Sequence, residues 1–312
     1  MRPVLRWMIQ ARRWLAAMVS VVVCTLAPMR AVAEPPAQKL PSAFLAFPHI
    51  ESTGSFDTRI ELVNLTKDSQ QLNCFFVTQG LGTYCQEIGF LVYLTPYQPL
   101  SWLASSGLND LTSGSAVPPF SGTGDLLCAV VAPFPDVEAY NTVQGRATVF
   151  AQSGATVSYG AVGFQRLAYG DYDGVIGLGS TYDYCPAELH FQVLTDRPLL
   201  TSDLILVPCS QNLLTQSVAS TGVKFLITNE FEQTFSSSTT VACYGRWTFS
   251  ELSELYTRAK LGSDTAHLSV RGVGGGLLGL VIDRVSATGI AGNEPSFEGG
   301  RTAVVRLPYE SE

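Results

Sequence analysis

The sequence predicts a mainly β protein built from two related β-sandwich domains of the immunoglobulin-like type. Short runs of alternating apolar and polar residues recur along the 312-residue chain, and clusters of turn-forming residues separate them. Helix signals are few, which favours sandwiches over mixed folds. The order of these runs in the first half recurs in the second half. We therefore expect a diverged internal duplication with one short helix in each half.

The first 33 residues have the pattern of an export signal peptide. Arginines precede an apolar stretch from Trp14 to Leu26, which is too short to span a membrane comfortably. Ala31-Val32-Ala33 then forms a small-x-small cleavage site. The predicted mature chain begins at Glu34, and residues 34–41 form a proline-rich, mobile lead-in. A twin-arginine signal at Arg12-Arg13 and a lipoprotein signal ending at Cys24 are less complete alternatives.

Composition and charge narrow the classes of partner. Hydrophobic residues make up 46% of the chain and charged residues only 14%, so the chain is too apolar for disorder. Cleavage after Ala33 removes five arginines and no acid, which takes the formal net charge from −7 to −12. So acidic a chain, without a basic run, is not expected to bind nucleic acid. No later segment is apolar for long enough to insert into a membrane as a helix.

Six cysteines remain after removal of the signal peptide, and their even number predicts three disulfides in an exported protein. None forms a C-x-x-C motif, so the chain lacks the spacing of a zinc ribbon or a thioredoxin-like site. Four of the cysteines lie in runs that resemble strands, which predicts two pairs among them. The remaining two cysteines form the third pair by elimination. The expected pairs are Cys209–Cys243, Cys74–Cys128 and Cys85–Cys185.

Residues 42–196 are predicted to form the first domain. Its most regular stretch, from Asp57 to Val77, has the pattern of a β-hairpin with turn residues between two alternating runs. Cys74 lies on the apolar face of the second run. The remaining predicted elements are strands at Ala43–Ile50, Phe90–Tyr93, Asp125–Ala132 and Leu189–Leu194, a helical turn at Pro99–Ala104, and a hairpin of Gly145–Ala151 with Ala155–Arg166.

Residues 197–312 are predicted to form the second domain with the same order. Thr248 and Glu251 form a capping box, which predicts a helix through about Lys260. In the hairpin before it, Cys243 occupies the place of Cys74. The remaining predicted elements are a strand at Leu204–Pro208, hairpins of Val223–Asn229 with Ser238–Trp247 and of His267–Val273 with Leu277–Arg284, and a last strand at Thr302–Leu307.

Three stretches carry a resemblance to a known group of proteins. They are DTRIELVNLT with the following NCFFV, QPLSWLASSGL, and VPC with the later TNEFEQTFSSSTTVACY. Together they resemble a group of uncharacterised exported bacterial proteins that are β-rich and contain cysteines. The resemblance covers most of the mature chain. The resemblance implies export and a β-rich fold. The group has no assigned activity, so no catalytic residue is carried over to this chain.

The long loop from Tyr169 to Pro186 is the predicted functional surface, because loops of this length in compact domains are usually functional or disordered. Its tyrosines offer apolar area and hydroxyl groups for a sugar or a protein, although covering a sheet edge is the commoner role of such rings. Its carboxylates could hold calcium, but they do not follow the EF-hand pattern. The candidate ligand-binding residues are Tyr169, Tyr172, Tyr182 and Tyr184, and the candidate calcium ligands are Asp171, Asp173 and Asp183.

No catalytic residue can be assigned from the sequence. The chain has three histidines and neither a G-x-S-x-G nor an H-E-x-x-H motif. Carboxylates such as Glu61, Asp125 or Glu188 could still converge in space as a glycosidase pair. The leading prediction is an exported, non-enzymatic protein with a binding, adhesion or structural role, located in the periplasm, on the cell surface or outside the cell. Its expected partner is a surface glycan or an envelope protein, and it needs no cofactor. The alternatives are a secreted glycan hydrolase and a calcium-dependent sugar-binding module.

Overall fold

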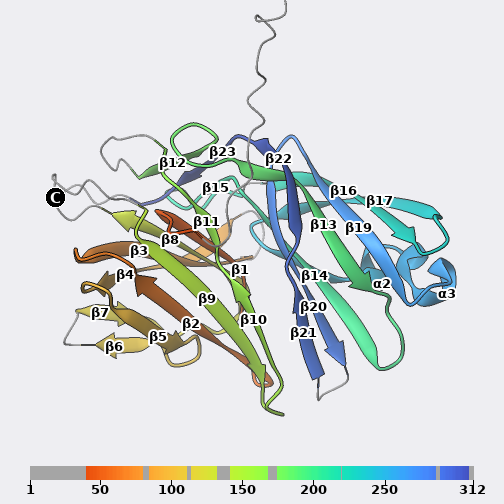
Figure 1. Cartoon of the computed structure of the whole chain (residues 1–312), viewed down its shortest axis with the longest axis horizontal. Coiled ribbons are helices and arrows are strands. Elements are labelled where there is room, and N and C mark those ends of the chain that lie inside the picture. The colour runs from red at the N-terminus through yellow and green to blue at the C-terminus, as the bar shows by residue number, and fades with distance from the viewer. Residues whose placement is uncertain are drawn as a thin grey trace, which may run out of the picture. The chain divides into compact units, whose positions relative to one another are not determined.

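The described part of the chain is almost entirely β structure. The computed structural model describes residues 40–79, 84–110, 114–131, 141–167, 174–218, 220–285 and 289–308. All of them belong to one compact unit, Glu34–Glu312 (Figure 1). Within these ranges no helix is long and apolar enough to cross a membrane.

Two sheets are formed by strands from the first half of the chain. One has five strands in the order β11-β1-β8-β3-β4, and the other has four in the order β10-β9-β2-β5. The five-stranded sheet contains β1 (Phe44–Ser52), β3 (Gln70–Gln79), β4 (Cys85–Leu94), β8 (Gly122–Val131) and β11 (Val162–Phe164). The four-stranded sheet contains β2 (Phe56–Asn64), β5 (Pro99–Leu103), β9 (Val143–Ala151) and β10 (Thr156–Gly160).

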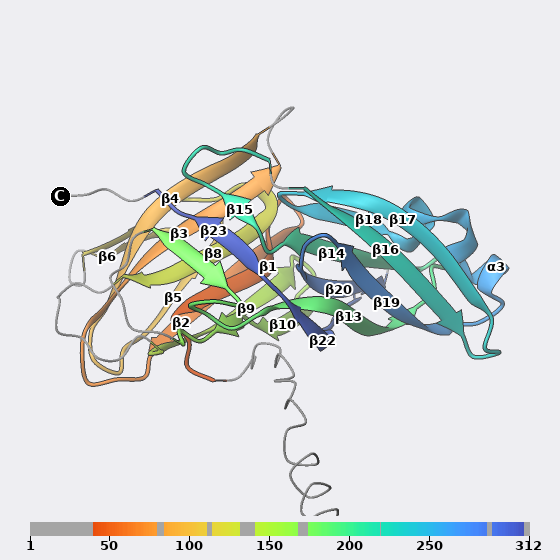
Figure 2. The same cartoon turned by 90° about the horizontal axis from the view of Figure 1, so that it is seen from above.

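Two further sheets are formed almost wholly by the second half. Their strand orders are β17-β16-β19-β13-β22 and β18-β14-β20-β21, and Figure 2 shows β17, β16 and β19 side by side. The first contains β13 (Cys185–Leu194), β16 (Ser220–Asn229), β17 (Thr234–Ala242), β19 (Thr265–Val273) and β22 (Ser296–Arg301). The second contains β14 (Leu200–Pro208), β18 (Gly245–Thr248), β20 (Leu277–Val285) and β21 (Gly289–Asn293).

A fifth sheet takes its strands from both halves of the chain. Here β12 (Val175–Leu178) pairs with β23 (Ala303–Arg306), which in turn pairs in parallel with β15 (Gln211–Asn212). A sixth, two-stranded sheet consists of β6 (Leu108–Asp110) and β7 (Ser115–Val117). The last strand of the chain is therefore held by a strand from its first half.

The predicted fold of two immunoglobulin-like β-sandwich domains is wrong. Two sandwiches would give four sheets, whereas the described strands form five sheets of three to five strands and one two-stranded sheet. This sheet count is that of a five-bladed β-propeller of small sheets. The halves also exchange strands, because β13 lies in a sheet of the second half and β23 in a sheet with β12. The prediction overlooked these pairings because they join residues far apart in sequence.

One hydrophobic core runs through both halves. The larger cluster of buried side chains includes Phe47 and Phe76 from the first half and Ile205 and Leu280 from the second. A smaller cluster, which includes Phe225 and Tyr256, is formed by the second half together with β13. Burial of these side chains is the main favourable contribution to folding, so much of it depends on both halves being present.

Two of the four predicted hairpins are present, and two are not. β9 pairs with β10, and β16 pairs with β17, although the predicted return strands run on into β11 and β18, which belong to other sheets. The stretch from Asp57 to Val77, however, is not a hairpin, because β2 and β3 lie in different sheets. Buried Asn64 holds the connection by donating to the carbonyl oxygens of Asp68 at 2.7 Å and Thr95 at 2.9 Å. β19 and β20 likewise lie in different sheets.

The two predicted helices have different outcomes. The segment that begins at Pro99 is the edge strand β5, in which buried Trp102 pairs with Ile60 of β2. Proline is tolerated at the start of an edge strand because the missing N–H leaves no gap in the ladder. The capping box of Thr248 and Glu251 is present. The helix after it is broken into α2 (Phe249–Leu252), a 3-10 turn (Glu254–Tyr256) and α3 (Arg258–Leu261).

The six cysteines in the described part of the chain all form disulfides, but only one predicted pairing is correct. Cys74 and Cys128 face each other on β3 and β8 and are bonded as expected. The other two bonds are Cys85–Cys243 and Cys185–Cys209, so the predicted Cys209–Cys243 and Cys85–Cys185 pairs are wrong. Flanking strand patterns do not reveal which cysteines meet across sheets. Cys185 reaches Cys209 past Gly276, where a side chain would collide with the Cys185 sulfur.

We expect removal of the Cys85–Cys243 bond to cost more stability than removal of Cys74–Cys128. The four cysteines are equally buried, but the bonds close loops of 158 and 54 residues. Loss of either should cost about 2–5 kcal/mol, and the longer loop adds roughly 1 kcal/mol. Urea unfolding of the two double alanine variants measures the difference. A larger loss for Cys74→Ala/Cys128→Ala would contradict the prediction.

Candidate functional site

Four charged side chains meet where β1 of the first half contacts β14, β18 and β20 of the second. Arg284 donates from Nη2 to Glu51 Oε2 at 2.7 Å and from Nε to Asp203 Oδ2 at 2.8 Å. Arg246 Nη2 lies 2.6 Å from Asp203 Oδ2, and its Nη1 lies 3.5 Å from Glu51 Oε1. The two guanidinium groups and two carboxylates thus alternate in a closed ring, which we call the ion ring.

The ion ring is largely buried, so its charges must compensate one another. Glu51, Asp203 and Arg284 have side chains that are 4%, 6% and 11% exposed. Burial alone would raise the pKa of Glu51, but the hydrogen bond from His49 and the charge of Arg284 outweigh it and lower this pKa to about 2. The carboxylate of Glu51 is therefore ionised throughout the neutral range.

His49 extends the ion ring toward the core. Its Nδ1 lies 2.7 Å from the Tyr244 hydroxyl, and its Nε2 lies 3.3 Å from Glu51 Oε2. Burial lowers the pKa of His49, which favours the neutral imidazole. In that state Nε2–H donates to Glu51 and Nδ1 accepts from Tyr244. The Tyr159 hydroxyl also donates to the backbone oxygen of His49.

Hydroxyl, imidazole and carboxylate thus stand in the order of a catalytic triad, but their setting does not suit catalysis. Tyr244 is 5% exposed and His49 fully buried, so a substrate cannot reach the hydroxyl in this conformation. Burial also raises the pKa of Tyr244, which works against a nucleophilic phenolate. The arrangement holds β1 against the second half.

A cleft of about 560 Å³ opens beside the ion ring and shares Arg284 with it. The Arg284 guanidinium carbon lies 4.2 Å from the centroid of the Phe56 ring, a cation–π contact. Its Nη1 is buried and has no hydrogen-bond partner. The lining combines hydroxyl, amide and apolar groups, and comprises Ser55, Phe56, Ala151, Gln152, Ser153, Pro198, Leu199, Leu200, Thr201 and Arg284.

The predicted tyrosine surface is only partly within the described residues. Tyr169, Tyr172, Asp171 and Asp173 lie outside them, so their proposed roles stay predictions. Tyr182 is 3% exposed, and Tyr184 is half-buried and packs where Gly179 leaves room. Asp183 accepts a hydrogen bond of 2.7 Å from the Gln165 backbone. The described tyrosines therefore pack against the fold and do not form an exposed platform.

The carboxylates considered for glycoside hydrolysis are not brought together. Glu61 accepts from Arg146 Nε at 2.7 Å on β2, and Glu188 accepts from the Ser269 hydroxyl on β13. Asp125 is buried on β8. Across the described ranges, no group of three or more His, Cys, Asp or Glu side chains is placed to hold a metal ion.

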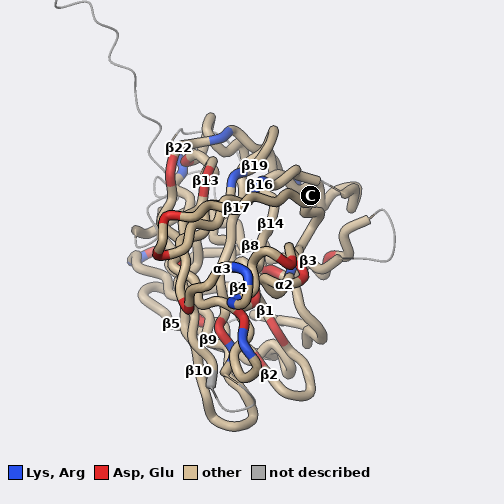
Figure 3. Tube along the Cα trace, turned by 90° about the vertical axis from the view of Figure 1, so that its right-hand side faces the viewer, with Lys and Arg blue, Asp and Glu red and all other residues tan. Residues whose placement is uncertain are grey.

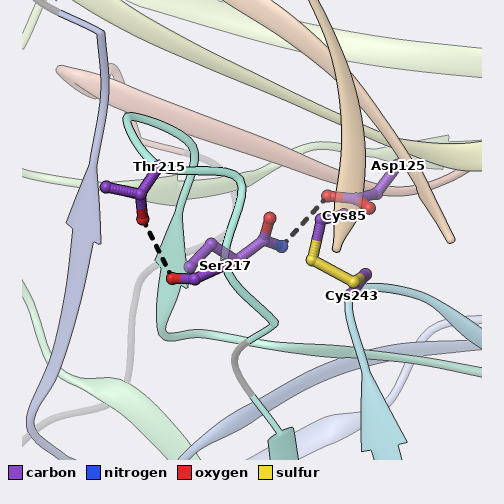
Figure 4. Close-up of a disulfide and its surroundings, with 6 residues drawn as sticks. Cys85, Asp125, Thr215, Ser217 and Cys243 are labelled. Atoms are coloured by element: carbon purple, nitrogen blue, oxygen red, sulfur yellow. Dashed lines mark hydrogen bonds between the residues drawn. A yellow bond between two sulfur atoms is a disulfide. The ribbon is translucent and has the colours of Figure 1, made fainter. Parts of the chain in front are cut away.

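Asp125 is a fully buried acid near the Cys85–Cys243 disulfide (Figure 4). Gln211 donates to its Oδ2 at a long 3.4 Å, and its Oδ1 has no partner. Burial raises the pKa of Asp125 well above its usual value, and the hydrogen bond from Gln211 only partly opposes this. The protonated acid is the favoured form because an unpaired buried carboxylate is costly.

The sequence interpretation did not single out the ion ring. Its signal was present, since Glu51, Asp203 and Arg284 are charged residues in strands that are largely apolar and buried. A charge inside a buried strand indicates a partner in the fold. The partner could not be named, because Glu51 and Arg284 are 233 residues apart. Figure 3 shows how sparse charged residues are along the rest of the trace.

We expect Glu51→Gln to destabilise the protein by about 3–5 kcal/mol at neutral pH, because it leaves buried guanidinium charge uncompensated. Glu61→Gln is the matched control, since the side chains of Arg146 and Glu61 are 61% and 29% exposed and their pair should contribute only about 0–1 kcal/mol. Because the folded pKa of Glu51 is depressed from 4.5 to about 2, its stabilising contribution is complete above pH 4.5 and is lost as the pH falls toward 2. Denaturant unfolding between these limits should show the difference between wild type and Glu51→Gln shrinking. Equal costs for the two substitutions would contradict this.

Asp125→Asn should have the opposite pH dependence. The folded pKa of Asp125 is raised, so the wild type loses stability as the pH rises from the unfolded value of 3.8 toward the folded pKa. Asparagine cannot ionise and still accepts from Gln211. The variant should therefore gain free energy of unfolding relative to wild type at about pH 8 and lose that gain near pH 4. A difference that does not change with pH would show that Asp125 ionises normally.

Comparison with known proteins does not place the chain in a family: no family model matches it, and no curated protein is significantly similar to it.

Proposed function

We propose that this is an exported, non-enzymatic binding protein whose ligand occupies the cleft beside Arg284. The observation that carries the proposal is the cleft itself, a hollow of about 560 Å³ whose lining combines apolar and neutral polar groups. Hollows of this size with a few convergent polar groups are the usual form of ligand sites. Three turns and residues of β2, β9, β14 and β20 supply the lining from both halves of the chain.

Export is supported by two independent features. All six mature cysteines are disulfide-bonded, and such bonds persist in oxidising compartments. The first 33 residues have the charge, apolar stretch and cleavage site of a signal peptide. A periplasmic, cell-surface or extracellular location follows from this proposal.

A non-enzymatic role is supported by how the reactive groups are arranged. The triad-like set of Tyr244, His49 and Glu51 is sealed in the core, and the carboxylates of the ion ring are held by two arginines. Arg284 is the one charged residue in the cleft lining, and it is already paired. The cleft thus offers shape and hydrogen bonds but neither a carboxylate pair nor an activated nucleophile.

The chemistry of the lining favours a neutral sugar as the ligand. The hydroxyls of Ser55, Ser153 and Thr201 can each donate and accept, as sugar hydroxyls require. Phe56 and Leu199 offer apolar area for the C–H face of a sugar ring. An anion is disfavoured, because the charge of Arg284 is already balanced by Glu51 and Asp203 and the lining has no other cation.

We expect Thr201→Trp, which places an indole in the cleft, to weaken sugar binding by at least about tenfold. Thr265→Trp is the matched control, since Thr265 is equally exposed but lies on β19 and not in the cleft lining. The purified chain from Glu34 onward is screened on an array of neutral and acidic glycans, and the dissociation constants of the hits are measured by calorimetry.

Binding of neutral glycans that Thr201→Trp removes and Thr265→Trp preserves supports the proposal. Hits that both variants retain would place binding elsewhere on the protein. Hits confined to acidic glycans would contradict the ligand chemistry, and an array without hits would contradict glycan binding altogether. Circular dichroism and melting temperature confirm that each variant is folded.

A further inference from the structure

The strand β17 leaves one long sheet edge open. It pairs with β16 over nine residues without a bulge, and it is the first strand in the order β17-β16-β19-β13-β22 (Figures 1 and 2). The hydrogen bond from Asn229 N to Gln233 O fixes which residues exchange bonds along the hairpin. In an antiparallel pair, residues whose backbone groups bond to the neighbouring strand alternate with residues whose backbone groups point away from it. The backbone groups of Thr234, Ser236, Ser238 and Thr240 therefore point away from β16.

Another long edge in the described part of the chain is covered. This is β4, where the Ser115 hydroxyl bonds both the N–H and the carbonyl of Tyr93 at 3.0 and 3.1 Å. The Cys85 N–H of the same strand donates to Gln216 O at 3.0 Å. Within the described residues, none of the backbone hydrogen bonds outside the strand ladders involves β17. The chain thus protects one long edge and leaves the other available.

The sequence of β17 also lacks the usual protection of an edge strand. Its residues, TFSSSTTVA, include no charge and no proline. Natural edges commonly carry such residues, or a bulge, because a regular edge with open N–H and C=O groups pairs with another strand. The four residues with outward backbone groups all have small hydroxyl side chains, and all four are exposed. They offer no bulk that would keep another strand away.

We propose that β17 pairs antiparallel with β17 of a second copy of this chain across a two-fold axis. An axis at Ser237 places Thr234 opposite Thr240 and Ser236 opposite Ser238. Hydroxyl then faces hydroxyl in both of these pairs, and such cross-strand pairs are favourable. The two five-stranded sheets become one continuous sheet of ten strands. A closed two-fold contact of this kind uses the same patch on both copies.

The observations favour a second copy over a foreign peptide. Recognition of a foreign strand draws its specificity from pockets for alternate side chains, and the hydroxyl side chains along this edge form none. The strand complements itself, because its donors and acceptors match and no like charges meet. The chain as a whole carries a net charge of −7, which opposes contact elsewhere and leaves this neutral edge as a favourable place for two copies to meet.

The test compares the oligomeric state of three forms of the full mature chain with its disulfides intact. Ser236→Lys/Ser238→Lys places like charges opposite each other across the axis. The matched control, Leu226→Lys/Thr265→Lys, adds the same charge to exposed positions on β16 and β19, which are paired on both sides. Sedimentation velocity is measured over roughly a hundredfold range of concentration, since the dimer fraction follows mass action.

We expect wild type and control to dimerise with rising concentration and the edge variant to stay monomeric with an unchanged circular dichroism spectrum. Hydrogen exchange of individual amides adds a second readout that does not depend on the variants. In the wild-type dimer, the amides of Thr234, Ser236, Ser238 and Thr240 should become protected as concentration rises, because they alone gain partners.

A wild type that remains monomeric over the whole range would overturn the proposal. So would a dimer that survives in the edge variant, or a dimer in which the four amides exchange as fast as in the monomer. If an unrelated extended peptide protects the same four amides while the protein stays monomeric, the edge is a site for a foreign strand.

Discussion

The burial of charge where the two halves of the chain meet is the constraint on which the fold depends. Glu51, Asp203 and Arg284 are almost inaccessible to water, and each is tolerable there only because the others are present. Glu51 comes from β1 and the other members of the ion ring from β14, β18 and β20. Any displacement of β1 against these strands would separate opposite charges in a medium that screens them poorly. The ion ring therefore specifies how the halves pack, whatever net stability it contributes.

The other links between the halves act on different terms of the free energy. The Cys85–Cys243 bond reduces the conformational freedom of the unfolded chain, whereas β12 and β23 add backbone hydrogen bonds to the folded one. The buried acids then give stability an uneven pH dependence. Glu51 stabilises only when ionised, and Asp125 is most favourable when protonated. Acidification thus weakens the ion ring, while it removes the free-energy cost of keeping Asp125 protonated in the folded protein.

Features that depend on neighbouring residues could be predicted from the sequence, and features that depend on distant partners could not. The capping box at Thr248 is local and was predicted correctly. The pairings of β9 with β10 and of β16 with β17 are also local and were predicted, although without the ends of the return strands. Alternation correctly marked β2 and β3 as strands, but a period of two gives the faces of a strand and not its neighbours. The same limit explains the two wrong disulfides. In the candidate site, the charges inside largely apolar strands could be recognised from the sequence. The cleft could not be predicted, because its lining comes from turns of both halves and the sequence does not show that these turns meet.

The two surfaces proposed for recognition share one chemical property. The cleft lining is neutral except for Arg284, whose charge is already balanced, and β17 carries no charge at all. The protein thus uses its few buried charges to hold its own halves together. Hydroxyl, amide and backbone groups remain for outside contacts. Hydrogen bonds between neutral groups are weak singly and depend on geometry, so recognition of this kind requires a rigid framework. The ion ring supplies that rigidity next to the cleft, because Arg284 belongs to both the ion ring and the cleft lining.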